Sequence, residues 1–188
     1  MMNLRVLPSA LALLFLALHA AAHSEKSLKA HVHGSAQLTI ALEDDKSLQV
    51  DLDSPADSIV GFEHKARSEP DKKTQAAALA HLEKGLSQLV EFPGELGCKV
   101  SDAKVGMEAE EHEAKAVKKP AAAESAHGEH SDVNATFALK CEKPVTGHSA
   151  KIGLIGLFPK VKSVSVKVLG PTAQNEKKMS RNGESIEF

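Results

Sequence analysis

Residues 31–53 read HVHGSAQLTIALEDDKSLQVDLD, and their regular alternation decides the fold. Every second residue from Val32 to Leu42 is apolar or small, whereas most residues between them are polar, which is the pattern of a half-buried strand. The polar turn Glu43-Asp44-Asp45-Lys46 follows, and the alternation then resumes as far as Asp53. The segment therefore predicts a β-hairpin over 31–53, ended by Ser54-Pro55.

A second segment, 69–91, has the three- and four-residue spacing of an amphipathic helix. Ser68-Glu69-Pro70-Asp71 is a typical helix start, because serine caps the first turn, proline fits within it and an acid follows three residues after the cap. Phe92-Pro93-Gly94 ends the pattern. The apolar stripe predicted to pack on a sheet consists of Ala76, Leu79, Leu82, Leu86 and Leu89.

Further apolar segments complete the predicted fold. Residues 97–105 and 133–141 indicate strands, and 152–154 and 164–168 give two more apolar segments, whereas the tail from Thr172 is polar until Ile186. Strands outnumber the one clear helix, and hairpins dominate. We therefore predict a single α+β domain, a mainly antiparallel β-sheet with one long amphipathic helix packed on it and an edge strand near the C-terminus.

Composition excludes one class of function. The chain has 188 residues, of which 23 are Lys or Arg and 25 are Asp or Glu, so its formal net charge is −2. That length fits one domain. A near-neutral chain without a basic face and stacking aromatic residues does not have the character of a nucleic-acid-binding protein.

The N-terminus has the features of an export signal. Residues 1–22 contain Arg5, no acid and the apolar run LPSALALLFLA from Leu7 to Ala17, followed by Ala20-Ala21-Ala22. This pattern predicts a secretory signal peptide cleaved after Ala22, because a membrane anchor would need a longer run to cross about 30 Å of hydrocarbon. We expect residues 23–188 to form the mature, exported domain, without a membrane span.

The two cysteines, Cys98 and Cys141, are expected to form a disulfide in an exported protein. On the chain-entropy model, closing a loop of this length stabilises the fold by roughly 4 kcal/mol. The alternative is a thiolate metal site, which is disfavoured because the chain lacks a C-x-x-C pair.

Residues 107–132, MEAEEHEAKAVKKPAAAESAHGEHSD, differ from the rest of the chain. They lack the apolar surface needed for packing, so we predict a disordered, mobile insert. Its imidazoles and carboxylates suit zinc, and also copper(II) or nickel(II), although a solvated charged linker would have a similar composition. The candidate metal ligands in the insert are His112, His127 and His130.

Three further histidines are candidate ligands. His31 and His33 would face the same side of the predicted strand, about 6.6 Å apart at their Cα atoms, and could converge on one ion. The alternative is a pair of solvated histidines at the start of a strand. A lone histidine such as His64 is more often structural, but its loop position and its neighbour Glu63 keep it a candidate.

Catalysis without metal has no support in the sequence. The chain contains no nucleophile elbow, P-loop or dinucleotide fingerprint, and pairing of the cysteines removes the usual thiol nucleophile. We therefore expect that the protein is not an enzyme.

Several motifs in order resemble those of the ZrgA-like family of periplasmic zinc-binding proteins. They are His31-Val32-His33-Gly34, Ser54-Pro55, Gly61-Phe62-Glu63-His64, Gly97-Cys98, the histidine- and acid-containing insert, Cys141, and Leu157-Phe158-Pro159 followed by Val164, Val166 and Val168. The resemblance covers nearly all of 30–188. The insert of this chain departs from the family pattern, because the insert of the family is usually richer in histidine.

The resemblance implies a periplasmic protein that binds Zn²⁺ and assists its uptake by passing the ion to a zinc ABC transporter or its periplasmic binding protein. It carries His31, His33 and His64 as motif positions. Two alternatives stay open from the residues alone. One is a metalloenzyme or copper-handling protein that uses His23, His31 and His33, and the other is a metal-free interaction module that recruits a partner at a sheet edge.

Overall fold

The computed structural model describes residues 32–109, 130–171 and 174–188. These residues belong to one compact unit that extends from His31 to Phe188. The predicted signal peptide, His31, and residues 110–129 of the predicted insert lie outside the described residues. Within the described part of the chain, no helix is long and apolar enough to cross a membrane.

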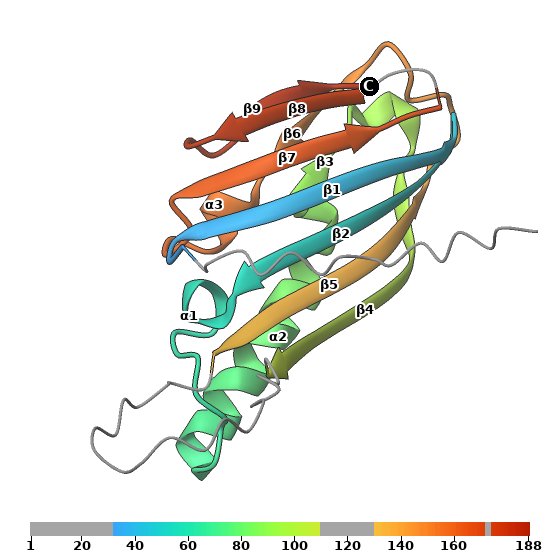
Figure 1. The fold of residues 1–188 in the computed structure, drawn as a ribbon. Coiled ribbons are helices and arrows are strands. Elements are labelled where there is room, and N and C mark those ends of the chain that lie inside the picture. Colours follow the sequence, from blue (N-terminus) through green and yellow to red (C-terminus); the bar gives the residue numbers. More distant parts are fainter. Residues whose placement is uncertain (1–31, 110–129, 172–173) are drawn as a thin grey trace, which may run out of the picture. The chain divides into compact units, whose positions relative to one another are not determined.

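A six-stranded sheet forms the body of the fold (Figure 1). Its strand order is β4-β5-β2-β1-β7-β8. The strands are β1 (Ser35–Asp44), β2 (Ser47–Pro55), β4 (Lys99–Ala109), β5 (Ser131–Lys140), β7 (Ser163–Leu169) and β8 (Gln174–Met179). The predicted hairpin is confirmed as β1 and β2, which pair antiparallel, with Leu38 opposite Leu52.

One pairing in this sheet is parallel. The β1 strand pairs with β7 in parallel register, and Leu38 lies opposite Val166. The other pairings are antiparallel, so the sheet is mainly antiparallel as predicted. Alternate side chains of the central strands fill the core, because successive residues of a strand point to opposite faces. The buried set includes Leu38, Ile40, Val50, Leu52, Phe137, Leu139, Val164 and Val166.

A smaller sheet lies at the end of the long helix. It has the order β3-β6-β9, formed by β3 (Val90–Glu91), β6 (Ser149–Ile152) and β9 (Glu184–Glu187). The short helices are α1 (Ala56–Ile59), α3 (Leu154–Leu157) and the 3-10 helix η1 (Gly94–Leu96). The predicted C-terminal edge strand is therefore present, but the tail forms two strands, β8 and β9, in different sheets.

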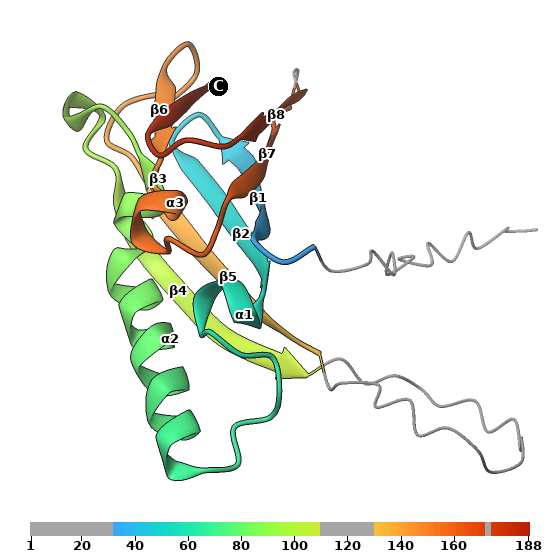
Figure 2. The same ribbon diagram turned by 90° about the vertical axis from the view of Figure 1, so that its left-hand side faces the viewer.

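The long helix α2 (Glu69–Leu89) confirms the predicted helix. Ser68 caps it by accepting a hydrogen bond from the backbone N–H of Asp71, at 3.2 Å. Leu82, Leu86 and Leu89 of the predicted stripe are buried. Figure 2 shows α2 along one side of the sheet, with its N-terminal turns extending past the end of β4. Ala76, in that N-terminal half, is accordingly exposed rather than packed.

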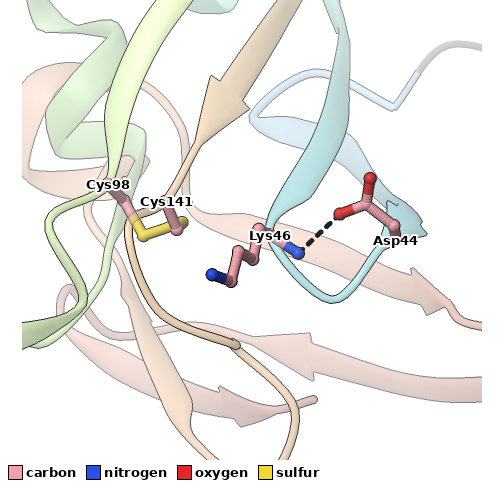
Figure 3. Close-up of a disulfide and its surroundings, with 4 residues drawn as sticks. All are labelled: Asp44, Lys46, Cys98 and Cys141. Atoms are coloured by element: carbon pink, nitrogen blue, oxygen red, sulfur yellow. Dashed lines mark hydrogen bonds between the residues drawn. A yellow bond between two sulfur atoms is a disulfide. The ribbon is translucent and has the colours of Figure 1, made fainter.

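The predicted disulfide is confirmed: Cys98 and Cys141 are bonded, which joins the start of β4 to the end of β5 (Figure 3). The turn between β1 and β2 lies beside it, because the backbone N–H of Cys141 donates to the carbonyl of Lys46, at 2.8 Å. Within that turn, the backbone N–H of Lys46 donates to the Asp44 carboxylate, at 2.7 Å. This hydrogen bond is the main reason why the pKa of Asp44 lies below its usual range.

The structure corrects several boundaries predicted from the sequence. The helix ends at Leu89 rather than at Glu91, and β2 includes Ser54-Pro55, which were predicted to end the hairpin. The first strand begins at Ser35 rather than at His31. Both ends of the segment 107–132, predicted as a disordered insert, belong to strands: Met107 pairs with Val133 and Ala109 with Ser131. The backbone hydrogen bonds of this hairpin extend the sheet beyond the last clearly apolar residues, so polar composition alone misplaced the boundary.

Candidate functional site

His33 lies in a turn that precedes β1. The backbone N–H of Ser35 donates to the carbonyl of Val32, at 3.0 Å, and closes the turn. Gly34 occupies the left-handed region with φ +76°, which disfavours residues with a Cβ. His33 is therefore not on a strand face, so its predicted strand position is wrong, whereas the predicted convergence of His31 and His33 on one ion stays a prediction. His31, its expected partner, lies outside the described residues.

The turn is held from both sides. The backbone N–H of Gly34 donates to the buried hydroxyl of Ser58 in α1, at 3.0 Å. The carbonyl of Gly34 accepts from the backbone N–H of Lys162, at 2.7 Å. A Cβ at Gly34 would lie 3.2 Å from the carbonyl oxygen of Lys160. These contacts fix the backbone that carries His33 beside α1.

His130 reaches the same region from β5, which pairs with β2 on the side away from β1. It directly precedes β5, whose Asp132 pairs with Pro55 at the end of β2. The start of β1 lies at that end as well, since Gln37 pairs with Asp53. The start of β1, the end of β2 and the start of β5 are therefore neighbours, with α1 following β2 beside them (Figure 1).

Glu63 joins the two histidines. It lies in the connection between α1 and α2, and its side chain is only 12% exposed. Its Oε2 lies 2.6 Å from Nδ1 of His130, which is hydrogen-bond distance. Its Oε1 lies 3.6 Å from Nδ1 of His33, which is an ion-pair distance when the imidazole is protonated. One carboxylate therefore faces two imidazoles from distant parts of the chain.

The environment around this carboxylate is mixed in charge. Asp57 of α1 lies close, with Oδ2 3.8 Å from Nδ1 of His33. Its other oxygen, Oδ1, lies 3.1 Å from the ammonium of Lys160. Lys160 also donates to the carbonyl of Gly61, at 3.3 Å. The cluster thus contains two carboxylates, two imidazoles and one lysine that neutralises part of the negative charge.

Burial differs sharply within the cluster. The side chains of His33 and His130 are 63% and 45% exposed, whereas Glu63 lies beneath them. Oε1 of Glu63 is buried and has no hydrogen-bond donor among the described residues. A buried carboxylate oxygen without a donor is costly, so the position favours an arriving cation or an approach of the His33 ring.

His64, the third predicted ligand among the described residues, makes different contacts. Its ring stacks on Phe62, with centroids 4.5 Å apart. Its Nδ1 lies 3.2 Å from the carbonyl of Lys65. The structure therefore brings His33 and His130 together around Glu63 and holds His64 in a separate contact. A ligand role for His64 stays a prediction.

Two predicted ligands of the insert, His112 and His127, lie outside the described residues with His31. Asp57 and Lys160 were not identified from the sequence, because neither has a motif or a spacing that marks it. Glu63 was noticeable only as the neighbour of His64. The signal that identifies all three is the meeting of strand ends, which requires knowledge of the sheet order.

The arrangement suits a cation with nitrogen and oxygen ligands. Imidazole and carboxylate are zinc ligands, and exposed rings admit an ion from solvent. Within 32–109, 130–171 and 174–188, however, no group of three or more histidine, cysteine, aspartate or glutamate side chains is placed to hold a metal ion. The described residues therefore form a partial site, in which two imidazoles are gathered around one carboxylate.

Comparison with known proteins identifies a family. A family model described as ZrgA family zinc uptake protein matches residues 30–188. This match covers every described residue, including His33, Glu63 and His130. No curated protein matches the chain.

Proposed function

Because the chain belongs to the ZrgA family of zinc uptake proteins, we propose that it captures Zn²⁺ through histidines and carboxylates and passes the ion to a transport system. The observation that carries this proposal is the meeting of His33 and His130 at the carboxylate of Glu63. The two imidazoles are the proposed primary ligands, and Zn²⁺ is the cargo.

The exposure of the two imidazoles supports transient capture. A structural zinc site has four protein ligands in a closed tetrahedral shell, whereas a carrier needs an ion that a second protein can reach. Two half-exposed histidines meet that requirement. Water completes such a shell, and we propose that His31, His64, His112 and His127 supply further ligands, as their sequence contexts predict.

The proposal makes this protein a carrier rather than an enzyme. A catalytic zinc site holds three protein ligands around an open position in a cleft, whereas the proposed capture needs only ligands from which a second protein can take the ion. The proposed acceptor is a zinc ABC transporter or its periplasmic binding protein, as the uptake role of the family favours.

The proposed compartment is the periplasm. Two features support it: the signal-peptide pattern of residues 1–22 and the Cys98–Cys141 disulfide. Structural disulfides persist in oxidising compartments and are rare in the cytosol. Sequencing of the N-terminus of the protein isolated from a periplasmic extract tests both the compartment and the cleavage after Ala22.

A zinc titration by calorimetry at neutral pH tests the capture proposal. We expect the wild-type protein to bind Zn²⁺ and the variants His33→Ala and His130→Ala to bind it at least tenfold more weakly. His148→Ala is the matched control, because His148 is exposed and outside the cluster. A wild-type dissociation constant weaker than roughly 10 μM, about −7 kcal/mol, would contradict zinc capture.

A loop variant separates the two predicted ligand sets. Because Ala109 pairs with Ser131, residues 110–129 can be replaced by a short glycine-containing turn that keeps His130. If the cluster is the main site, tight binding persists and only the number of bound ions falls. If binding disappears while the fold is intact, the insert holds the ions and the assignment to His33 and His130 is wrong.

A further inference from the structure

The contact between Oε2 of Glu63 and Nδ1 of His130 is too short for these two atoms to be ligands of one zinc ion. Zinc–nitrogen and zinc–oxygen bonds are about 2.0 Å long, so two ligands of a tetrahedral ion lie about 3.3 Å apart. Oε2 of Glu63 and Nδ1 of His130 are 2.6 Å apart. This distance belongs to a charge-assisted hydrogen bond, in which the carboxylate accepts and Nδ1–H donates.

The tautomer of His130 follows from that hydrogen bond. A ring that carries its proton on Nδ1 has its remaining lone pair on Nε2, and only a lone pair binds a metal. Neutral histidine in water favours the opposite tautomer, with the proton on Nε2. The Glu63 carboxylate therefore selects the less common form of the ring and makes Nε2 the coordinating nitrogen.

His33 has the same kind of neighbours. Among the described residues, the charged atoms near its Nδ1 are Oε1 of Glu63, at 3.6 Å, and Oδ2 of Asp57, at 3.8 Å. Both are carboxylate oxygens, which accept hydrogen bonds and do not donate them when ionised. Oε1 of Glu63 is buried and lacks a hydrogen-bond partner among the described residues, so at 3.6 Å it attracts a proton on Nδ1 electrostatically. Both oxygens therefore favour the Nδ1–H form of His33.

We propose that Glu63 is a positioning residue that fixes the Nδ1–H tautomer of His130, favours the same tautomer of His33, and so directs Nε2 of each ring toward Zn²⁺. The inference rests on the proposed zinc capture and adds a role that the sequence motifs do not assign to Glu63. Carboxylates that hold metal-binding histidines in this way orient the rings and raise their basicity.

The burial of Glu63 fits positioning rather than direct contact with the cargo. Its side chain is 12% exposed beneath two rings that are 63% and 45% exposed. An ion that arrives from solvent reaches the rings before the carboxylate. Low solvent exposure also strengthens the hydrogen bond, because water competes less for the carboxylate oxygens.

Nitrogen-15 NMR of the zinc-free protein gives a direct test, because the ring nitrogens report the tautomer without any metal. The expected spectrum shows Nδ1–H tautomers for the neutral rings of His33 and His130. In Glu63→Ala the ring of His130 reverts to the common Nε2–H form, and the ring of His33, which keeps its neighbour Asp57, shifts toward that form. Glu63→Gln, which keeps one acceptor oxygen and loses the second, is expected to release one ring. His148 serves as the internal reference and should not change.

Zinc affinity supplies the second measurement. Loss of a carboxylate that orients ligands weakens metal binding by about 10- to 100-fold, so we expect Glu63→Ala to bind Zn²⁺ that much more weakly and Glu63→Gln to lie between it and wild type. Glu69→Gln is the matched control, because Glu69 is 86% exposed and pairs only with Lys72 among the described residues. Thermal unfolding of the zinc-free variants confirms that each is folded.

The outcomes distinguish the inference from the proposed function. If wild type does not bind Zn²⁺, zinc capture fails, whatever the tautomers are. If wild type binds Zn²⁺ and Glu63→Ala binds it equally well, capture stands and the positioning role is overturned. Nε2–H tautomers in wild type, combined with loss of zinc binding in Glu63→Ala, would also overturn positioning and make Glu63 a direct ligand.

Discussion

Oε2 of Glu63 lies 2.6 Å from Nδ1 of His130, although 67 residues separate the two in the sequence. The contact exists because β5 pairs with β2, which places the residue before β5 beside the connection that follows α1. His33 approaches the same carboxylate because β1 pairs with β2 on its other side. Three strand ends thus assemble the cluster, so its ligands need no shared sequence motif.

Lys160 is predicted to weaken zinc binding at this cluster. Its ammonium lies 3.1 Å from Asp57, which in turn lies 3.8 Å from His33. A lysine charge near the proposed ligands repels Zn²⁺, and because the side chain is 57% exposed the effect is screened by solvent. We expect Lys160→Gln to bind Zn²⁺ up to about fivefold more tightly, which corresponds to at most about 1 kcal/mol.

Calorimetry at low and high ionic strength measures this effect. The gain in affinity should shrink as salt is added, because screening reduces the repulsion that the lysine exerts in wild type. Lys162→Gln is the control, since the side-chain ammonium of Lys162 donates to the carbonyl of Pro159, whereas that of Lys160 pairs with Asp57. Equal affinities of Lys160→Gln and wild type at low salt would show that the ammonium does not act on the bound ion.

Local sequence patterns predicted the elements that depend on neighbours in the chain. The alternation around Leu38 and Ile40 gave the hairpin, and Ser68 marked the start of α2, because strand faces and helix caps are set within a few residues. The pairing of β1 with β7 was not predictable in this way. In this pairing Leu38 lies opposite Val166. Which strand pairs in parallel with β1 depends on the path of the whole chain between the two strands.

The same distinction applies to the candidate site. The motif around His33 and the composition around His130 identified both residues as candidate ligands, but neither pattern connects them. Glu63 provides that connection through a contact that only the tertiary structure creates. The strand assignment of His33 failed because Gly34, at φ +76°, turns the chain before the sheet begins.

Removal of the disulfide should destabilise the fold without affecting zinc binding. The double variant Cys98→Ser, Cys141→Ser opens a loop that spans β4 and β5, and the expected loss in free energy of unfolding is roughly 4 kcal/mol. Urea unfolding of wild type and variant measures the loss. Cys141 follows the end of β5 whereas His130 precedes its start, so the folded variant should keep the wild-type zinc affinity. If zinc affinity also fell, the Cys98–Cys141 disulfide would be needed for the geometry of the cluster around Glu63.

The helix α2 should depend on a few buried leucines. Leu82 is fully buried against the core, and Leu82→Ala is expected to lower the free energy of unfolding by about 2–5 kcal/mol, because it removes apolar contacts and leaves a cavity. Lys84→Ala, on the exposed side of the same helix, should change it by less than about 0.5 kcal/mol. Equal effects of the two substitutions in urea unfolding would contradict the packing of this face.

The connection between β8 and β9 should stabilise the fold in a pH-dependent way. Oε1 of Glu184 accepts hydrogen bonds from the backbone N–H groups of Ser180 and Arg181, both at 3.0 Å. These bonds, followed by the charges of Arg181 and Lys177, lower the pKa of Glu184 below its usual range. A lowered pKa in the folded state means that the carboxylate stabilises the fold above the pH at which glutamate titrates in the unfolded chain.

This stabilisation is lost as the pH falls through the lower pKa of the folded state. Glu184→Gln keeps an acceptor oxygen but removes the charge, so we expect a lower Tm than wild type at pH 7 and a difference that vanishes at strongly acidic pH. Glu187→Gln, an exposed position in the same strand, is the control and should unfold like wild type at both pH values. A Tm difference for Glu184→Gln that stays constant with pH would assign the effect to packing rather than to the charge.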